Sequence, residues 1–232
     1  MFPCVPGIAV SPVTRWSVHG GLWSSGGEAY NAAMPTRSLP AAGVVLAAGT
    51  STRMGTNKLL LDLEGASLLR RVATRALDAG LDPVVVVLGH DAEPARRQLD
   101  GLPVRIAASA GYREGIATSL RAGIAALPAD TPAAVMLLAD MPLVTSDMIR
   151  TVANCYRERT ARIVVSDYEG IIAPPVLYHR AFFPELASLT GENAGREVVR
   201  RHSDEVQAVR WPRALLQDID LPGDYERLRP GP

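Results

Sequence analysis

Lys58 is the residue whose type most strongly suggests chemistry in this 232-residue chain, because it is the chain's one lysine. The other 23 of the 24 basic residues are arginine. An ammonium is a compact point charge on a flexible stem, whereas a guanidinium is a planar fork of donors. A lysine that is retained despite this preference for arginine indicates that the position needs the smaller ammonium group. The alternative is an ordinary surface lysine that escaped the bias.

Lys58 ends a loop of small and hydroxyl-bearing residues. The loop reads Leu46-Ala47-Ala48-Gly49-Thr50-Ser51-Thr52-Arg53-Met54-Gly55-Thr56-Asn57-Lys58. Small residues let a backbone approach a base or sugar closely, and successive N–H groups can bind an anion. Arg53 can place two donors on phosphate oxygens. The glycine spacing fits neither the Walker A loop nor the dinucleotide fingerprint, and an ordinary turn remains the alternative.

Two groups of carboxylates are candidates for holding a metal. Asp140 directly follows the apolar run 135–139, where ligands bind at the carboxyl edge of a parallel sheet. From this position alone, a metal ligand and a structural turn aspartate are equally open. Asp218 and Asp220 form the second group, and the alternation of an extended segment puts both on one side. Spacing therefore does not separate Asp218 from Asp220.

The segments that surround these residues alternate between predicted strands and predicted helices. Four consecutive valines at 84–87 and other apolar runs are typical of parallel strands buried on both faces. The resulting prediction is a three-layer α/β/α sandwich with a mainly parallel sheet. Strands are predicted at 43–47, 83–88, 104–107, 133–139, 163–165 and 206–210, and helices at 67–79, 92–99, 118–127, 146–159, 194–201 and 224–228.

Two parts of the chain lack this regular pattern. Residues 1–38 are rich in proline and glycine, have no periodic apolar face, and are predicted to be a poorly ordered extension. Residues 39–232 are predicted to form one domain. Between Gly170 and Ala194, Pro174, Pro175 and Pro184 interrupt the pattern, and no regular element is predicted.

Composition excludes several classes of protein. The 24 basic residues are balanced by 24 acidic ones, which argues against a partner bound by phosphate neutralisation, so no nucleic acid is expected. No apolar run approaches the roughly 18 residues of a membrane helix, and no membrane partner is expected. The absence of a secretory pattern predicts a cytoplasmic location. Cys4 and Cys155 lack the spacing of a zinc site.

The loop resembles a known signature. LAAGTSTRMGTNK is similar to the LAAGxGxRMGxxK motif of the MobA-like nucleotidyltransferases, especially the molybdenum cofactor cytidylyltransferases. The resemblance covers about residues 41–230 and fades after Gly170. It implies a Rossmann-like fold of the nucleotide-diphospho-sugar transferase type. It also implies transfer of a nucleoside monophosphate from a nucleoside triphosphate to a phosphorylated acceptor, with release of diphosphate.

The resemblance also assigns roles to single residues. It makes Lys58 and Arg53 catalytic, and Asp140, in an ADMP segment like the family's GDMP, a Mg²⁺ ligand. The segment from Asp218 resembles DIDTPEDL and favours Asp220 as the second ligand, leaving Asp218 and Asp224 structural. Residues 111–123 resemble WxxGMxxSLRAG, with Ser109 where the family has asparagine. The implied nucleotide-binding residues are Leu46, Ala47, Ala48, Gly49, Ser51, Gly55 and Ser119.

The substrates follow less directly from the resemblance. The guanylyltransferase branch has Gly-Gly where this chain has Ala47-Ala48, and the added methyl groups favour CTP over GTP. The implied acceptor is molybdopterin, with a molybdoenzyme or its chaperone as a further partner. Pro174, however, replaces a histidine of the family's GHPVLF-like segment. A sugar phosphate or another phosphorylated alcohol therefore remains an alternative acceptor, and a redox or regulatory role remains an alternative function.

Overall fold

The computed structural model describes residues 5–6, 41–51, 54–158 and 161–228. Its strands are β1 (Val5–Pro6), β2 (Ala42–Ala47), β3 (Asp62–Leu63), β4 (Ala66–Ser67), β5 (Val84–Leu88), β6 (Arg105–Ala108), β7 (Ala133–Leu138), β8 (Ile163–Tyr168), β9 (Ile172–His179) and β10 (Val206–Trp211). Its α-helices are α1 (Leu68–Asp78), α2 (Ala92–Arg97), α3 (Ile116–Ala125), α4 (Ser146–Glu158), α5 (Phe183–Ser188), α6 (Ala194–Arg201) and α7 (Pro222–Leu228).

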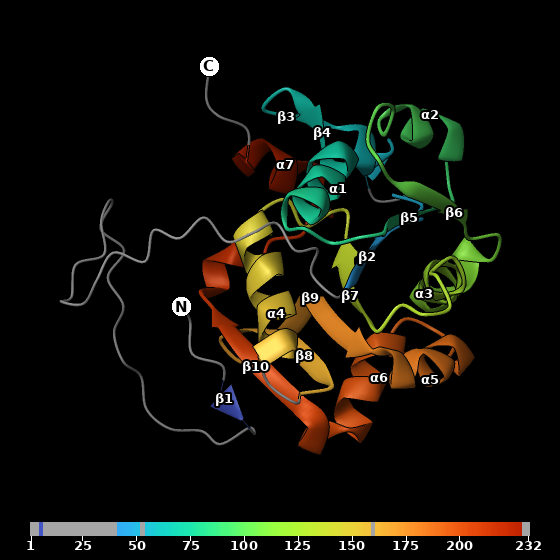
Figure 1. The fold of residues 1–232 in the computed structure, drawn as a ribbon. Coiled ribbons are helices and arrows are strands. Elements are labelled where there is room, and N and C mark those ends of the chain that lie inside the picture. The colour runs from blue at the N-terminus through green and yellow to red at the C-terminus, as the bar shows by residue number, and fades with distance from the viewer. Residues whose placement is uncertain (1–4, 7–40, 52–53, 159–160, 229–232) are drawn as a thin grey trace.

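The main sheet has the strand order β1-β10-β8-β9-β7-β2-β5-β6 (Figure 1). The pairs β10–β8, β7–β2, β2–β5 and β5–β6 are parallel, whereas β9 runs antiparallel to both of its neighbours, β7 and β8. β1 pairs antiparallel with β10 at the edge. The predicted mainly parallel sheet is confirmed.

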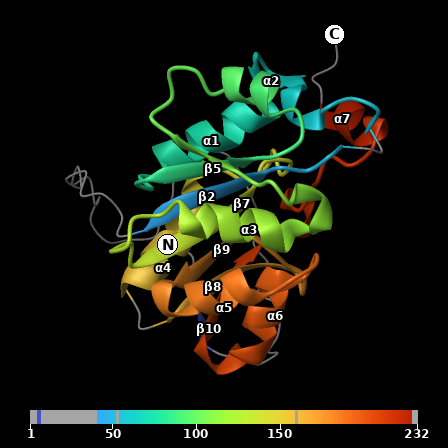
Figure 2. The ribbon, with the colours of Figure 1, turned by 90° about the vertical axis from the view of Figure 1, so that its right-hand side faces the viewer.

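Helices cover both faces of this sheet (Figures 1 and 2). One core joins the sheet to α1, α2 and α4, and includes Val45, Val86 and Leu137 from the strands. The other joins the opposite face to α3, α5 and α6, and includes Val44, Val87 and Met136. Alternate strand residues thus enter opposite cores, as the two-residue period of a strand requires. The predicted three-layer sandwich is confirmed.

Helix α1 begins and ends where its sequence signals predict. The Ser67 hydroxyl accepts a hydrogen bond from the Arg70 N–H at 3.2 Å, an N-cap that typically contributes about 1 kcal/mol. Gly80 has φ +85°, the left-handed conformation that ends helices and suits glycine. The N–H of Leu81 then donates to the carbonyl of Ala76, so the chain turns directly into β5.

The region after Gly170 is where the sequence prediction was wrong. It contains β9, a central strand, and α5, although prolines argue against both. β9 accommodates Pro174 and Pro175 at an irregularity in its pairing with β8, where the register shifts between Val164 and Ser166. Proline cannot donate a hydrogen bond to the ladder. The carbonyls of the two prolines accept hydrogen bonds from side chains of β8. Ser166 Oγ donates to Pro175 O and Tyr168 Oη donates to Pro174 O, both at 2.8 Å.

Three further points concern the comparison between the predicted and the observed elements. Pro184 lies in the first turn of α5, where a missing N–H costs nothing. A short hairpin of β3 and β4 was not predicted. The prediction for residues 1–38 falls outside the described residues, apart from the pairing of Val5 with Ala208 and of Pro6 with Gln207.

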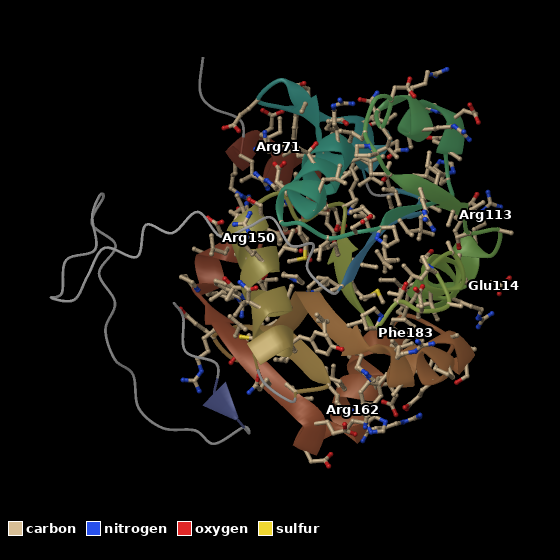
Figure 3. All side chains as sticks on the ribbon, in the orientation of Figure 1. Arg71, Arg113, Glu114, Arg150, Arg162 and Phe183 are labelled. Atoms are coloured by element: carbon tan, nitrogen blue, oxygen red, sulfur yellow. The ribbon has the colours of Figure 1, made fainter. Side chains whose placement is uncertain are left out.

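The labelled arginines Arg71, Arg113, Arg150 and Arg162 belong to different parts of the chain and lie apart from one another in the view of Figure 3. Within the described ranges, no helix is both long and apolar enough to cross a membrane.

Candidate functional site

The loop after β2 is fixed to the neighbouring strand ends by its backbone. The Ala139 N–H donates to the carbonyl of Leu46 at 3.1 Å, and the His90 N–H reaches the carbonyl of Ala48 at 3.5 Å. Ala48 lies against Gly89, where a Cβ atom would stand only 2.8 Å from the Ala48 methyl group. Gly89 is thus required for this close approach. Ala47 and Ala48 are both buried, whereas Gly49 is exposed.

The middle of the loop has two residues in the left-handed region, Ser51 with φ +50° and Gly55 with φ +68°. The Ser51 carbonyl accepts from the Met54 N–H at 3.0 Å, and its hydroxyl accepts from the backbone N–H of Lys58 at 3.2 Å. Ser51 therefore closes the loop onto the residue that ends it. Thr52 and the predicted catalytic Arg53 lie outside the described residues.

Lys58 starts a short 3-10 helix, Lys58–Leu60, which Asn57 caps by accepting from the Leu59 N–H at 3.1 Å. The Lys58 side chain is 11% exposed, and its Nζ lies 2.6 Å from Asp140 Oδ2 and 2.8 Å from Asp220 Oδ1. The three predicted residues are thus brought together from distant parts of the chain. Two of the three N–H groups of the ammonium are used in these bonds, which leaves one to donate elsewhere.

The charges of this cluster act on one another. Burial lowers the pKa of Lys58, but the charge of Asp140 and hydrogen bonds from Asp140 and Asp220 outweigh burial, so the pKa is raised above its ordinary 10.5. Asp218 is solvent-exposed, yet desolvation by the surrounding protein and the charges of Asp140 and Asp220 raise its pKa to about 6. Lys58 and Arg196 oppose this rise. The cluster therefore holds an excess of negative charge over the one ammonium.

Backbone contacts hold both carboxylates in place. The buried Ile219 donates its N–H to the Asp140 carbonyl at 3.1 Å. Asp224, in the first turn of α7, accepts through Oδ2 from the N–H groups of Asp220 at 3.0 Å and of Leu221 at 2.7 Å, so it ties the segment before the helix to its start. The predicted structural role of Asp224 agrees with these bonds. On the other side, Arg75 of α1 donates to the carbonyls of Pro142 and Val144, which fixes the turn after Asp140.

The donor set of this cluster fits a divalent cation. In the described part of the chain, no three His, Cys, Asp or Glu side chains are grouped to hold a metal ion by themselves. Mg²⁺, however, is usually bound by one or two carboxylates together with substrate phosphates and waters. Asp140 and Asp220 already share one cation, the Lys58 ammonium. Asn57 Nδ2, a buried donor in the same loop, has no hydrogen-bond partner among the described residues.

The remaining predicted residues are placed as follows. Leu46, Ala47, Ala48 and Gly49 lie at the carboxyl end of β2, beside the cluster. Ser119 is buried in α3, and its hydroxyl lies 3.2 Å from that of Ser109. Ser119 thus contacts the serine that stands where the family has asparagine. Its role in nucleotide binding stays a prediction.

The sequence reasoning missed Arg75 and gave no role to Arg196, and it assigned Asp218 a different environment from the one observed. Arg75 stands in a helical pattern that explains it as a surface residue, and nothing in its spacing reveals the distant carbonyls it binds. Arg196 lies in a GENAGR segment whose weak resemblance was the only available signal. Asp218 was interpreted as a solvated charge, whereas desolvation by the surrounding protein, together with the charges of Asp140 and Asp220, raises its pKa.

Comparisons with known proteins agree with this geometry. The profile of the MobA-like NTP transferase domain matches residues 43–206. The purine catabolism protein PucB of Bacillus subtilis (strain 168) is 30% identical, over 81% of this chain and 95% of that protein. The nicotine blue oxidoreductase of Paenarthrobacter nicotinovorans is 29% identical, over 68% of this chain and 80% of that protein.

Solved structures are also similar to this chain in fold and in sequence. The crystal structure of Rv0371c from Mycobacterium tuberculosis H37Rv superposes with a TM-score of 0.71 at 30% identity, over 81% of this chain and 97% of that one. A complex of Rv0371c with manganese superposes at 0.66 and 29% identity, over 81% and 96% of the two chains. With its fold, its loop signature and a profile match over most of its length, the chain belongs to the MobA-like NTP transferase domain family.

Proposed function

We propose that this protein transfers a nucleoside monophosphate, with CMP favoured, from a nucleoside triphosphate to a phosphorylated acceptor and releases diphosphate. The observation that carries the proposal is the Lys58 ammonium held by Asp140 and Asp220 at the end of the loop after β2. The loop supplies backbone donors for phosphates, and the carboxylates supply a cation site. Family membership supports nucleotidyl transfer as the reaction class.

In this reaction an oxygen of the acceptor phosphate attacks the α-phosphorus. A new P–O bond forms while the bond between the α-phosphorus and the bridging oxygen breaks, and diphosphate leaves. The chain forms no covalent bond, so its tasks are to align the reactants and to balance charge. The remaining N–H of the Lys58 ammonium donates to an α-phosphate oxygen, where negative charge grows in the transition state.

Asp140 and Asp220 are the residues that would hold Mg²⁺. When bound there, the ion neutralises negative charge on the triphosphate. Ser51 keeps the loop closed onto Lys58, and Arg53 is proposed to bind phosphate oxygens. Leu46, Ala47, Ala48, Gly49, Gly55 and Ser119 are proposed to complete the nucleotide site.

The substrates and the setting of the reaction belong to the proposal as well. CTP is favoured because Ala48 fills the space against Gly89 and keeps the loop from moving back to admit a larger base. Molybdopterin is one candidate acceptor, with a molybdoenzyme or its chaperone as the receiving partner. A sugar phosphate or another phosphorylated alcohol is the alternative. A cytoplasmic location is proposed, since that is where these phosphorylated substrates would be met.

A redox role is the second candidate function, because one relative is named an oxidoreductase. The cluster of Lys58 with Asp140 and Asp220 argues against it for this chain. An electron-transfer site does not need a cation site next to a phosphate loop, whereas phosphoryl chemistry does.

Diphosphate release separates these functions. The full chain is incubated with ATP, CTP, GTP or UTP, with and without MgCl₂, against a small panel of acceptors that includes molybdopterin and sugar phosphates. Acceptor-dependent, Mg²⁺-dependent release that is fastest with CTP supports the proposal. The redox role would be favoured if no nucleotide gave diphosphate release under any condition and the protein instead catalysed reduction of a dye by a nicotinamide cofactor.

A further inference from the structure

The Lys58 ammonium lies where the two carboxylates proposed for Mg²⁺ converge. Its Nζ is 2.6 Å from Asp140 Oδ2 and 2.8 Å from Asp220 Oδ1, so it bridges one oxygen of each carboxylate. Mg²⁺ takes carboxylate oxygens as direct ligands, at about 2.0–2.1 Å. An oxygen that is bonded to the ammonium has less negative charge to offer an ion, and two cations so close together repel each other. Lys58 and a divalent ion therefore compete for the same pair of carboxylates.

Backbone bonds that do not involve Lys58 hold the two carboxylates. The carbonyl of Asp140 accepts from the Ile219 N–H at 3.1 Å, and the N–H of Asp220 donates to Asp224 Oδ2 at 3.0 Å. The positions of Asp140 and Asp220 are thus fixed independently of the cation between them. The pair can exchange one cation for another without a rearrangement of the backbone.

Lys58 combines a fixed backbone with a movable head group. Its N–H donates to Ser51 Oγ at 3.2 Å, and its carbonyl accepts from the Leu61 N–H at 3.1 Å. The ammonium stands on a flexible stem of carbons, which can swing while these two bonds persist. The two carboxylates use two of its three N–H groups, and the third can bind a phosphate oxygen before the other two are released. Lys58 is therefore built to change partners.

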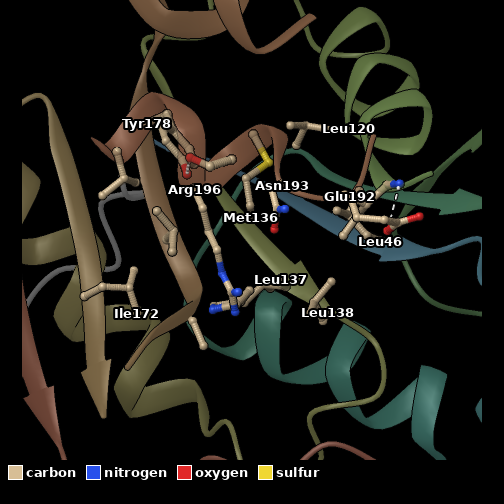
Figure 4. Close-up of a pocket in the computed structure, with 16 residues that line it drawn as sticks. Leu46, Leu120, Met136, Leu137, Leu138, Ile172, Tyr178, Glu192, Asn193 and Arg196 are labelled. Atoms are coloured by element: carbon tan, nitrogen blue, oxygen red, sulfur yellow. Dashed lines mark hydrogen bonds between the residues drawn. The ribbon is translucent and has the colours of Figure 1, made fainter. Parts of the chain in front are cut away.

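Arg196 is a second cation near the cluster, and it differs from Lys58 in its contacts. It lines a cavity of about 270 Å³ between α3, α6, β7 and β9, and extends toward Leu137 of β7 (Figure 4). Arg196 acts on Asp218 through its charge. Among the described residues, however, the Arg196 guanidinium makes no hydrogen bond to a carboxylate of the cluster. Lys58, rather than Arg196, is the cation that must yield its place to a metal ion.

We propose that Lys58 holds the cation position between Asp140 and Asp220 in the protein without nucleotide, and that the nucleotide phosphates draw the ammonium away so that a divalent ion can enter. The inference rests on the proposed function and adds the order in which its components bind. Without phosphates, an ammonium that leaves this largely buried position loses two ion pairs and gains none, which is costly. With phosphates, new ion pairs replace them. Metal and nucleotide therefore strengthen each other's binding.

Binding of Mn²⁺ to the full chain without nucleotide tests the competition. Mn²⁺ is used in place of Mg²⁺ because the free ion can be measured by electron paramagnetic resonance. Lys58→Met keeps an unbranched side chain and removes the ammonium. It should bind Mn²⁺ at least about tenfold more tightly than the wild type, because a repelling charge is gone. Equal or weaker Mn²⁺ binding by Lys58→Met would overturn the inference.

Two further variants show where this Mn²⁺ binds. Arg200→Met removes one positive charge from an exposed side chain of α6 that pairs with Glu197, and it should leave the Mn²⁺ affinity unchanged. The double variant Lys58→Met/Asp140→Ala should lose the gain in affinity, because it lacks one of the two carboxylates. A gain that persists in the double variant would place the ion elsewhere and refute the competition. Melting curves verify that each variant is folded.

The wild-type protein allows a direct test, because Lys58 is its one lysine. Protein grown on lysine labelled with ¹³C at Cε gives a nuclear magnetic resonance signal from this side chain alone. CTP added without metal should shift the signal, since the ammonium changes partners. The further change caused by Mg²⁺ should need an at least about tenfold lower free Mg²⁺ concentration with CTP than without it. A signal that bound CTP does not shift, or a Mg²⁺ requirement that CTP does not lower, would contradict the proposal.

These outcomes differ from those that test the proposed function. Tighter Mn²⁺ binding by Lys58→Met, without diphosphate release from any nucleotide, would support the competition and refute the transfer. Mg²⁺-dependent transfer by the wild type, with unchanged Mn²⁺ binding in Lys58→Met, would refute the competition and leave the transfer standing. The labelled wild type decides the inference if Lys58→Met does not fold, and the Mn²⁺ comparison decides it if CTP does not bind.

Discussion

The backbone N–H of Ile219 donates to the carbonyl oxygen of Asp140 at 3.1 Å, which joins the C-terminal segment to the end of β7. Ile219 itself is fully buried in a small cluster with Leu63 and Leu68. Its two neighbours, Asp218 and Asp220, are therefore held beside Asp140 by a backbone bond and an apolar anchor. The position of the second carboxylate does not depend on its own charge.

Replacing Asp140 by alanine should abolish nucleotidyl transfer while the fold remains. The change removes one of two oxygen ligands proposed for Mg²⁺ and one partner of Lys58. Diphosphate release is measured across a MgCl₂ titration, with circular dichroism to verify folding. Asp147→Ala, an exposed aspartate on α4, is the matched control. Undiminished Mg²⁺-dependent turnover in Asp140→Ala would refute the assignment.

Asp220→Asn should be as damaging as Asp140→Ala, whereas Asp218→Asn should retain transfer. Asp220 contacts the shared ammonium at 2.8 Å, and Asp218 has no such contact among the described residues. The same diphosphate assay compares the two variants. The opposite pattern, with activity lost only in Asp218→Asn, would assign the second metal ligand to Asp218.

Lys58→Arg should lower turnover by about 10²-fold or more, equivalent to about 2.7 kcal/mol in the activation barrier. The variant keeps the positive charge, but its planar head cannot occupy the point between Asp140 and Asp220 in the same way. Thermal stability should change little. Arg200→Lys, an exposed substitution in the reverse direction, is the control. Normal turnover in Lys58→Arg would mean that only charge matters there.

The wild-type protein should use CTP at least about tenfold better than GTP, and Ala48→Gly should reduce that preference. The Ala48 methyl group is buried against Gly89, so its loss lets the loop move back and admit a purine. Competition assays with both nucleotides, reported as the ratio of the two kcat/KM values, measure the effect. Equal use of CTP and GTP by the wild type would show that this contact does not select the base.

Glu185→Gln should lower stability at neutral pH by less than about 1 kcal/mol, since the contacts are partly exposed. Partial desolvation raises the pKa of Glu185, but hydrogen bonds from His202 and Arg201 outweigh it and hold the pKa below its ordinary 4.5. Because this pKa is lower in the folded state than in the unfolded state, the contacts of Glu185 stabilise the fold above pH 4.5. This stabilisation is lost as the pH falls through the pKa of the folded state. Urea unfolding at pH 7 and below 4.5 should show the difference shrinking. A difference that is constant with pH would contradict this.

Much of the fold could be predicted from the sequence because its signals are local. The valine run of β5 and the cap at Ser67 act within a few residues, so their elements form as the pattern indicates. The region of β9 could not be predicted in this way. Pro174 and Pro175 lie where the register with β8 shifts, and their carbonyls accept hydrogen bonds from Tyr168 and Ser166, which belong to that other strand.

The candidate site divides in the same manner. The loop motif, the single lysine and the aspartate after β7 can all be recognised in the amino-acid sequence, since each is a property of consecutive residues. It left Asp218 and Asp220 equivalent, because alternation puts both on one side of an extended segment. Only the tertiary structure brought Lys58 between Asp140 and Asp220 and placed Arg196 on the wall of a cavity. Such contacts depend on how strands and helices pack across the sheet, and no local pattern in the chain encodes those distances.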